Sequence, residues 1–232
     1  ACLLIALSGR CVAQSDAVLP EGVKAVWDLE KAHREKTSTR ERVCLNGLWR
    51  WQPARNEKGP ATAENPASVD TPLPPDKWGW FKVPGCWPGI GDYMQKDSQT
   101  VHAHPAWKAE SLRNVSAAWH QREIAIPQDW AGRRVTIYAE YLNSAAVVYI
   151  DGKKAGNIQF PDGEVDLTSL CRPGGKHVLS VLVIAAPLSD ITLLFRDTNT
   201  APQEAKKAKA RVNRRGFCGD VFLVGTPAAA SV

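Results

Sequence analysis

Short apolar runs separated by turn residues fill the second half of the sequence. Residues 133–140 alternate between apolar and polar side chains, and this period of two is typical of a half-buried β-strand. Residues 145–150 are continuously apolar, and Asp151-Gly152 follows them as a strong signal for a tight hairpin. The pattern therefore predicts antiparallel β-structure for this part of the chain.

The same signals recur along the chain at roughly regular spacing. Further candidate strands cover residues 48–53, 78–83, 119–126, 153–158, 165–170, 177–184 and 216–224. About seven to nine short strands, with no alternation of strands and long helices, favour an all-β sandwich or jelly roll over a parallel α/β fold. A chain of 232 residues is long enough to give one such domain a substantial core.

The N-terminal residues have the features of a secretion signal. Residues 1–7 are apolar, and the small residues Cys11 and Ala13 stand where signal peptidases prefer them, which predicts cleavage after Ala13. A lipoprotein signal is the alternative, but Arg10 occupies the position of the lipid-bearing cysteine. We therefore expect residues 1–13 to be a signal-peptide remnant and the mature protein to be secreted or periplasmic, without a membrane span.

Two stretches lack a clear strand pattern. Residues 14–44 are mostly polar and predict a lead-in that is either a short helix or an extended segment. Residues 86–114 predict a long loop that contains His102 and His104, which lie on one face of an extended chain. Two imidazoles suit a metal ion, but no third ligand is evident, so an ordinary loop is expected and no metal site is predicted.

Charge and cysteine content leave several interpretations open. The net charge is +5, and much of the excess lies in residues 206–215. Such a run is expected to be a solvated loop, with binding of a polyanion as the alternative, and no nucleic-acid partner is predicted. Four cysteines follow the signal peptide and form no CxxC pair, so disulfides and buried free thiols both remain open; they are Cys44, Cys86, Cys171 and Cys218.

The residues alone do not identify a reaction. The sequence contains no GxSxG, HExxH or phosphate-binding glycine motif, and no pair of carboxylates stands out as an acid/base couple. Nine Trp residues suit both core packing and the stacking of sugar rings, and packing is the expected role of most of them.

Five motifs, in order along the chain, carry a resemblance to a known family. They are residues 45–49 (LNGLW), 82–87 (KVPGCW), 118–132 (AWHQREIAIP, then Trp130 and Gly132), 147–168 (the hairpin and DLT) and 215–223 (RGFCGDVFL). Together they resemble the N-terminal sugar-binding domain of glycoside hydrolase family 2, which includes β-galactosidases, β-glucuronidases and β-mannosidases. The resemblance covers residues 45–225 and implies a galactose-binding-like jelly-roll sandwich.

The resemblance also implies a function. Such a domain is non-catalytic and shapes one wall of the active site of a larger, secreted glycosidase. Family members hydrolyse O-glycosyl bonds with retention, using two Glu residues on a separate TIM barrel, so both catalytic residues are expected outside this chain. Residues 226–232 would begin the linker to an immunoglobulin-like domain, and the carbohydrate substrate would bind together with the barrel of a parent protein that can be a homo-oligomer.

Two substrate contacts follow from the same resemblance. In the β-galactosidase branch, the Asp of the closing motif lies near the substrate and a sodium ion, and Asp220 matches it. An Asn shortly before the "WHQR" strand also reaches the sugar there, and Asn114 matches it. Pairing of Asp220 with Arg215 and an ordinary loop role for Asn114 are the structural alternatives. Gly219 stands where the family usually has Arg, so the identity of the glycoside stays open.

Two other functions remain open. One is a stand-alone carbohydrate-binding module without hydrolase activity, which would need an exposed aromatic platform. The other is a parent protein that has lost catalysis and kept the scaffold.

Overall fold

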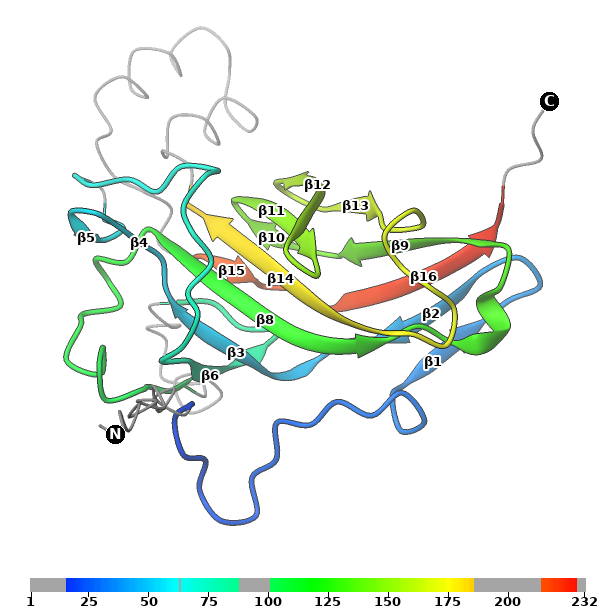
Figure 1. Cartoon of the computed structure of the whole chain (residues 1–232), viewed down its shortest axis with the longest axis horizontal. Helices are drawn as coiled ribbons and strands as arrows, with labels where there is room; N and C mark the ends of the chain where they lie inside the picture. Colours follow the sequence, from blue (N-terminus) through cyan, green and yellow to red (C-terminus); the bar gives the residue numbers. More distant parts are fainter. Residues whose placement is uncertain (1–15, 63, 88–100, 186–213, 229–232) are drawn as a thin grey trace, which may run out of the picture.

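Antiparallel strands make up nearly all of the regular structure (Figure 1). The computed structural model describes residues 16–62, 64–87, 101–185 and 214–228. Within these residues the one helical element is a 3-10 turn, η2 (Gln128–Trp130). The prediction of an all-β sandwich is confirmed.

Two sheets form the sandwich. The first has the strand order β1 (Arg34–Lys36), β2 (Glu41–Cys44), β16 (Val221–Pro227), β9 (Arg133–Ala139), β13 (Gly163–Asp166). The second has the order β12 (Lys153–Gln159), β11 (Ala145–Ile150), β14 (Lys176–Ile184), β8 (Ala117–Ala125), β3 (Gly47–Pro53), β6 (Gly79–Val83), β7 (Val101–His102). Two short ribbons complete the structure: β4 (Arg55–Asn56) with β5 (Gly59–Pro60), and β10 (Leu142–Asn143) with β15 (Gly216–Phe217).

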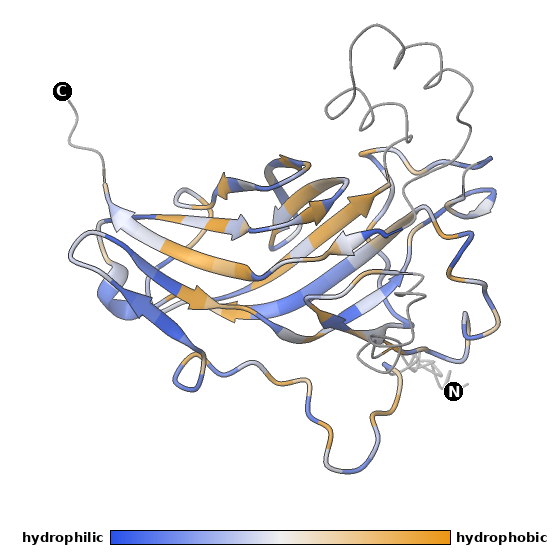
Figure 2. Ribbon diagram, turned by 180° about the vertical axis from the view of Figure 1, so that it is seen from behind, coloured by the Kyte–Doolittle hydropathy of each residue, from blue (hydrophilic) through white to orange (hydrophobic). Residues whose placement is uncertain are grey.

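The alternating pattern of β9 places its apolar side chains in the core. Ile137 is fully buried, and it pairs in register with Leu223 of β16 and Val165 of β13. Hydrophobic residues accordingly follow β14 and β16, whereas β1 is hydrophilic and the lead-in before it is mixed (Figure 2). A period of two in the sequence therefore specified both the strand and the face that it buries.

The predicted hairpin joins β11 and β12. Asp151 and Gly152 have φ angles of 49° and 78°, as a two-residue turn with left-handed residues requires. The Asp151 carboxylate also accepts a hydrogen bond from the backbone N–H of Val178, 2.7 Å away on β14. The turn is thus fixed to its neighbouring strand as well as by its own conformation.

One predicted strand is shorter than expected. Residues 165–170 continue an apolar pattern, but β13 ends at Asp166. The Asp166 carboxylate accepts a hydrogen bond from the N–H of Thr168 at 2.8 Å, which turns the chain away from the sheet. Local side-chain bonding has therefore overridden the strand pattern at this point.

The core between the sheets is aromatic. Seven of the nine Trp residues are buried and the other two are half-buried. Trp49, Trp51 and Trp87 are fully buried and pack with the apolar residues of both sheets. The expectation that most Trp residues serve packing is confirmed, and none of them forms an exposed platform.

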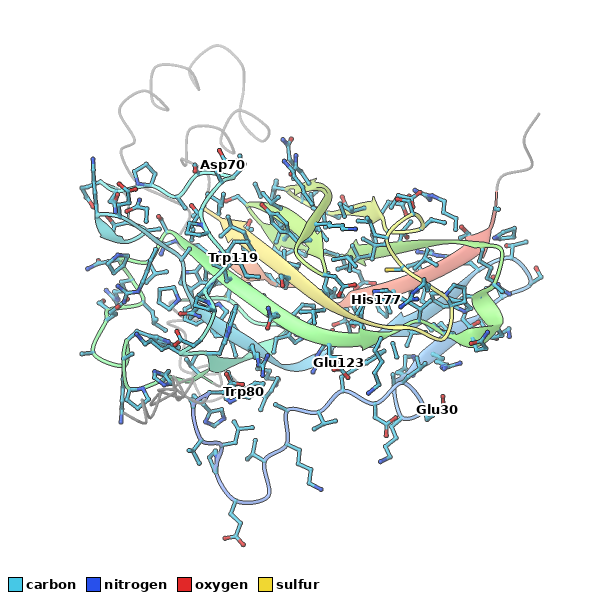
Figure 3. The ribbon with its side chains drawn as sticks, viewed as in Figure 1. Glu30, Asp70, Trp80, Trp119, Glu123 and His177 are labelled. Atoms are coloured by element: carbon cyan, nitrogen blue, oxygen red, sulfur yellow. The ribbon has the colours of Figure 1, made fainter. Side chains whose placement is uncertain are left out.

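The lead-in is extended in its described part and contains no helix. Residues 16–33 run along the outer face of the seven-stranded sheet, where the Trp80 indole N–H donates to the carbonyl of Ala17 at 2.8 Å (Figure 3). The Asp16 carboxylate pairs with Arg50 of β3, also at 2.8 Å. The chain then enters the five-stranded sheet through β1 and β2. The predicted signal peptide lies outside the described residues.

The loop that follows β3 covers another part of this outer face. A second apolar cluster, which includes Trp78, Trp119 and Leu182, lies beneath it. Tyr149 anchors the loop because its hydroxyl donates to the carbonyl of Val69 at 3.0 Å. In the part of the chain described here, no helix has the length and apolar character needed to cross a membrane.

Candidate functional site

The residues before β3 form a sharp bend that only glycine fits. Gly47 has φ = 126°, and a Cβ atom there would lie 3.2 Å from the Arg122 guanidinium. Arg122, which projects from β8, donates hydrogen bonds to the carbonyls of Leu45, Asn46 and Leu48. The "LNG" motif is therefore a backbone bend wrapped around one arginine.

Arg122 is deeply buried without a carboxylate partner among its described contacts. Its guanidinium lies 5.3 Å from the centre of the Trp49 ring, so an aromatic face and three carbonyl oxygens replace its hydration. Burial lowers the pKa of Arg122 to about 10, so the side chain is still charged at neutral pH. Arg122 therefore places a fixed positive charge at the centre of this bend.

Asp220 lies just before β16 and is half-buried. One carboxylate oxygen, Oδ1, accepts a hydrogen bond from the Asn46 side-chain amide at 2.9 Å. The Asn46 amide oxygen in turn accepts the N–H of Val221 at 3.2 Å. Burial, with a contribution from the Asp220 charge, also raises the pKa of the nearby Cys44 thiol. Asn46 thus fixes Asp220 in place and leaves the second carboxylate oxygen without a hydrogen bond to a described residue.

Asn114 lies in the loop before β8, and its side chain is exposed. The neighbouring carbonyl of Val115 accepts two hydrogen bonds, from the Trp87 indole at 2.9 Å and from the Arg215 guanidinium. Arg215 also donates to the carbonyl of Arg113 at 3.1 Å. Buried donors therefore hold the backbone on both sides of Asn114, while its amide faces outward.

Asp220 is part of the closing motif, residues 215–223, and the loop of Asn114 is bound to the first residue of the same motif. Arg215, the first residue of that motif, contacts the loop of Asn114, whereas Asp220 contacts the bend at Asn46. No hydrogen bond between Asp220 and Asn114 joins them in the described structure. The described side-chain hydrogen bonds of Arg215 run to the Asn114 loop, and none of them joins Asp220.

A surface hollow of about 600 Å³ adjoins the bend beneath the lead-in. Its lining includes Asn46, Gly47 and Arg122 of the bend and Lys24 and Lys31 of the lead-in. Lys24, Lys31 and Arg122 give it cationic groups that suit hydroxyl or carboxylate groups of a ligand, and Trp27 and Leu48 add apolar surface.

The other candidate residues are His102, His104 and the basic run, and they are separate from the group formed by Asn46, Arg122 and Asp220. His102 is half-buried on β7, and the buried His104 accepts a hydrogen bond at Nδ1 from the N–H of Ala106. Among the described residues, no three His, Cys, Asp or Glu side chains gather where they could hold a metal ion. The basic run is described only at Arg214 and Arg215, and residues 206–213 lie outside the described part.

The fold was compared with solved structures. The sequence itself matches no family model and no curated protein. The structure matches β-glucuronidase from Bifidobacterium dentium, solved with coumarin-3-O-glucuronide, at 25% identity with a TM-score of 0.52, over 84% of this chain and 31% of that one. It matches β-glucuronidase from Ruminococcus gnavus at 15% identity with a TM-score of 0.55, over 86% and 32%. An uncultured Clostridium β-glucuronidase matches at 18% and 0.53, over 84% and 30%.

The chain has the fold of one β-glucuronidase domain. The predicted resemblance to a glycoside hydrolase family 2 domain is thereby confirmed at the level of fold. The chain spans about a third of the length of these glucuronidases.

The sodium ion expected near Asp220 stays a prediction. A sodium ion needs several oxygen ligands, and Asn46 already occupies one of the two Asp220 oxygens. Among the described residues no group of three His, Cys, Asp or Glu side chains adds such ligands beside Asp220.

Sequence reasoning missed the residues that build this site. Asn46 and Arg122 stand inside two of the motifs without an expected role, and Arg215 is expected only as an alternative partner of Asp220. Arg122 had a usable signal, since an arginine at an inward position of an alternating strand must find buried acceptors. Asn46 had none, because its partner lies 174 residues away in the sequence.

Proposed function

We propose that the chain is the non-catalytic, sugar-facing domain of a secreted or periplasmic glycoside hydrolase of the family 2 type. It shapes one wall of the active site, while a TIM barrel elsewhere in the parent supplies the two catalytic Glu residues of a retaining mechanism. The supporting observation is the match of most of this chain to about a third of several β-glucuronidases.

In this proposal Asp220 and Asn114 are the sugar contacts. Asp220 offers a carboxylate oxygen as a hydrogen-bond acceptor for a sugar hydroxyl, and Asn46 fixes its direction. Asn114 offers an exposed amide that can both donate and accept. Asn46 orders the Asp220 side chain, and buried donors order the backbone on both sides of Asn114, which limits the conformational entropy lost on binding.

The burial of the Trp residues favours this role over a stand-alone carbohydrate-binding module. Such a module stacks sugar rings on an exposed aromatic platform. Here every Trp is buried or half-buried. A domain whose Trp residues all serve packing is better suited to completing a site than to capturing a glycan alone.

The test uses the complete product of the gene. It is assayed with p-nitrophenyl β-glucuronide, β-galactoside and β-mannoside. The proposal predicts hydrolysis of at least one of them with retention of configuration. A complete product that has no barrel and hydrolyses none would refute it, and tight glycan binding by such a product in calorimetry would favour the binding-module alternative.

Two variants then test the wall contacts. Asp220→Asn should lower kcat/KM about 10-fold or more, because a hydrogen bond to a charged group is lost, and Asn114→Ala should lower it by a smaller factor. The control is Asp129→Asn, an exposed aspartate beyond the far end of β8, about 30 Å along the strand from the Asn114 loop. If Asp220→Asn and the control behave alike, Asp220 is not a substrate contact.

A further inference from the structure

The segment after β6 pairs with the closing motif outside the main sheets. The N–H of Gly85 donates to the carbonyl of Phe217 at 2.7 Å. Trp87 and Arg215 exchange two backbone hydrogen bonds, of 2.9 and 3.0 Å, as an antiparallel bridge. This register places Cys86 opposite Gly216, with Cys218 two residues further along the same strand.

The pairing brings two thiols together. Cys86 is buried, Cys218 is half-buried, and their side chains are within hydrogen-bonding reach of each other. Gly216 permits this approach, since a Cβ atom there would lie only 2.8 Å from the carbonyl oxygen of Gly85. A bulkier residue would therefore force the two segments apart.

We propose that Cys86 and Cys218 form a disulfide bond when the protein meets a disulfide oxidant such as oxidised glutathione. The sequence left the connectivity open, and the backbone pairing of residues 85–87 with 215–217 selects this pair. The other two described cysteines lie elsewhere, Cys44 on β2 and Cys171 in the turn after β13. The inference does not depend on the proposed function.

The reaction balances with one equivalent of oxidant. One S–S bond forms between Cys86 and Cys218, and the S–S bond of glutathione disulfide breaks. Both cysteines are oxidised, and the two glutathione sulfurs accept the two electrons and the two protons. No metal or further reductant takes part.

The local chemistry favours this exchange. A hydrogen bond from Cys218 lowers the pKa of Cys86 to about 7, helped by the charge of Arg214. The thiolate is the reactive form of cysteine, so the lowered pKa favours attack by Cys86 on a disulfide oxidant. By contrast, burial raises the pKa of Cys171 to about 12, which keeps that thiol inert.

The disulfide would reinforce the candidate site. It would join the "VPGCW" motif covalently to the closing motif, two residues before Asp220. It would also secure the Trp87–Arg215 bridge, whose side chains hold the loop of Asn114. The positions of both proposed sugar contacts would then be maintained by one cross-link.

The test is peptide mapping of the natively folded protein after incubation with oxidised glutathione. Free thiols are alkylated, and the chain is digested with trypsin without reduction. Each cysteine then lies on a different peptide, with Cys86 on residues 83–96 and Cys218 on the peptide that begins at Gly216. We expect one cross-linked species joining these two peptides, two hydrogens lighter than their sum, that disappears on reduction.

Variants keep the result interpretable. Cys86→Ser and Cys218→Ser should each abolish the cross-link, whereas the matched control Cys44→Ser/Cys171→Ser should retain it. Retention of both free thiols in folded, oxidant-treated protein would overturn the proposal. So would a dominant cross-link from either cysteine to Cys44, Cys171 or the N-terminal cysteines.

Discussion

A fully buried histidine should make this domain sensitive to mild acid. His120 projects from β8 into the core and is completely inaccessible to solvent. Four aromatic rings surround it at centroid distances of 5.2 to 6.4 Å: Trp51, Phe81, Trp87 and Phe217. Burial lowers the pKa of His120 to about 3, opposed only weakly by the backbone of Ala118. The imidazole is therefore neutral in the folded protein throughout the physiological range.

The sign of the pH dependence follows from proton linkage. In the unfolded chain a histidine has a pKa of about 6.5, so below this pH the unfolded state binds a proton that the folded state rejects. Stability must then fall as the pH decreases from about 6.5 towards 3. At pH 4.5, two units below the unfolded pKa at about 1.4 kcal/mol each, the loss is about 3 kcal/mol. That is a large part of the roughly 5–15 kcal/mol that stabilises a typical domain.

The measurement is urea unfolding at pH 7.5 and pH 4.5, followed by the fluorescence of the buried Trp residues. Wild type should lose about 3 kcal/mol more than His120→Leu between these two values, because leucine fills a similar volume and binds no proton. Phe81→Leu is the matched control, since it disturbs the same cluster without removing a titratable group. The reasoning is wrong if wild type and His120→Leu lose the same free energy over this interval.

Three further predictions concern the bend and the thiols. Gly47→Ala should destabilise the fold by about 1–3 kcal/mol in urea unfolding, because φ = 126° is strained for alanine and its Cβ would press on Arg122. Asn46→Ala should cost about 1–3 kcal/mol by the same assay, since two hydrogen bonds are lost; an unchanged midpoint would show that they contribute nothing. The rate of disulfide formation should rise between pH 6 and 8 as Cys86 ionises. In the same folded protein, iodoacetamide should leave Cys171 unmodified. Alkylation of Cys171 at pH 8 would contradict its raised pKa.

Strand positions were predictable because their signals are local. The alternation in residues 133–140 reports which side chains face the core, and one pleated strand accounts for all of it. The Asp151-Gly152 turn was equally predictable, since left-handed φ angles at two successive residues leave few sequences to choose from. Such features depend on neighbours within a few residues, so a single sequence contains them.

The path of the lead-in was not predictable in the same way. Its Trp27 indole donates to the carbonyl of Cys44 at 2.9 Å, and Asp16 pairs with Arg50. These contacts join the lead-in to β2 of one sheet and β3 of the other, so they depend on the assembled sandwich. Loosely spaced apolar residues without that surface fit a short helix and an extended segment equally well, and only the assembled sheet decides between them.

The site combines both kinds of information. The motifs around Asn46, Arg122 and Asp220 were visible in the sequence, yet nothing local shows that they touch. In the structure Arg122 binds the backbone at the bend of the first motif. The Asn46 side chain at this bend donates a hydrogen bond to the Asp220 carboxylate and fixes its position. These contacts stabilise the bend whether or not the chain binds sugar. The motif order is therefore strong evidence for the fold, whereas the second oxygen of Asp220 and the exposed amide of Asn114 are the groups that bear on the ligand.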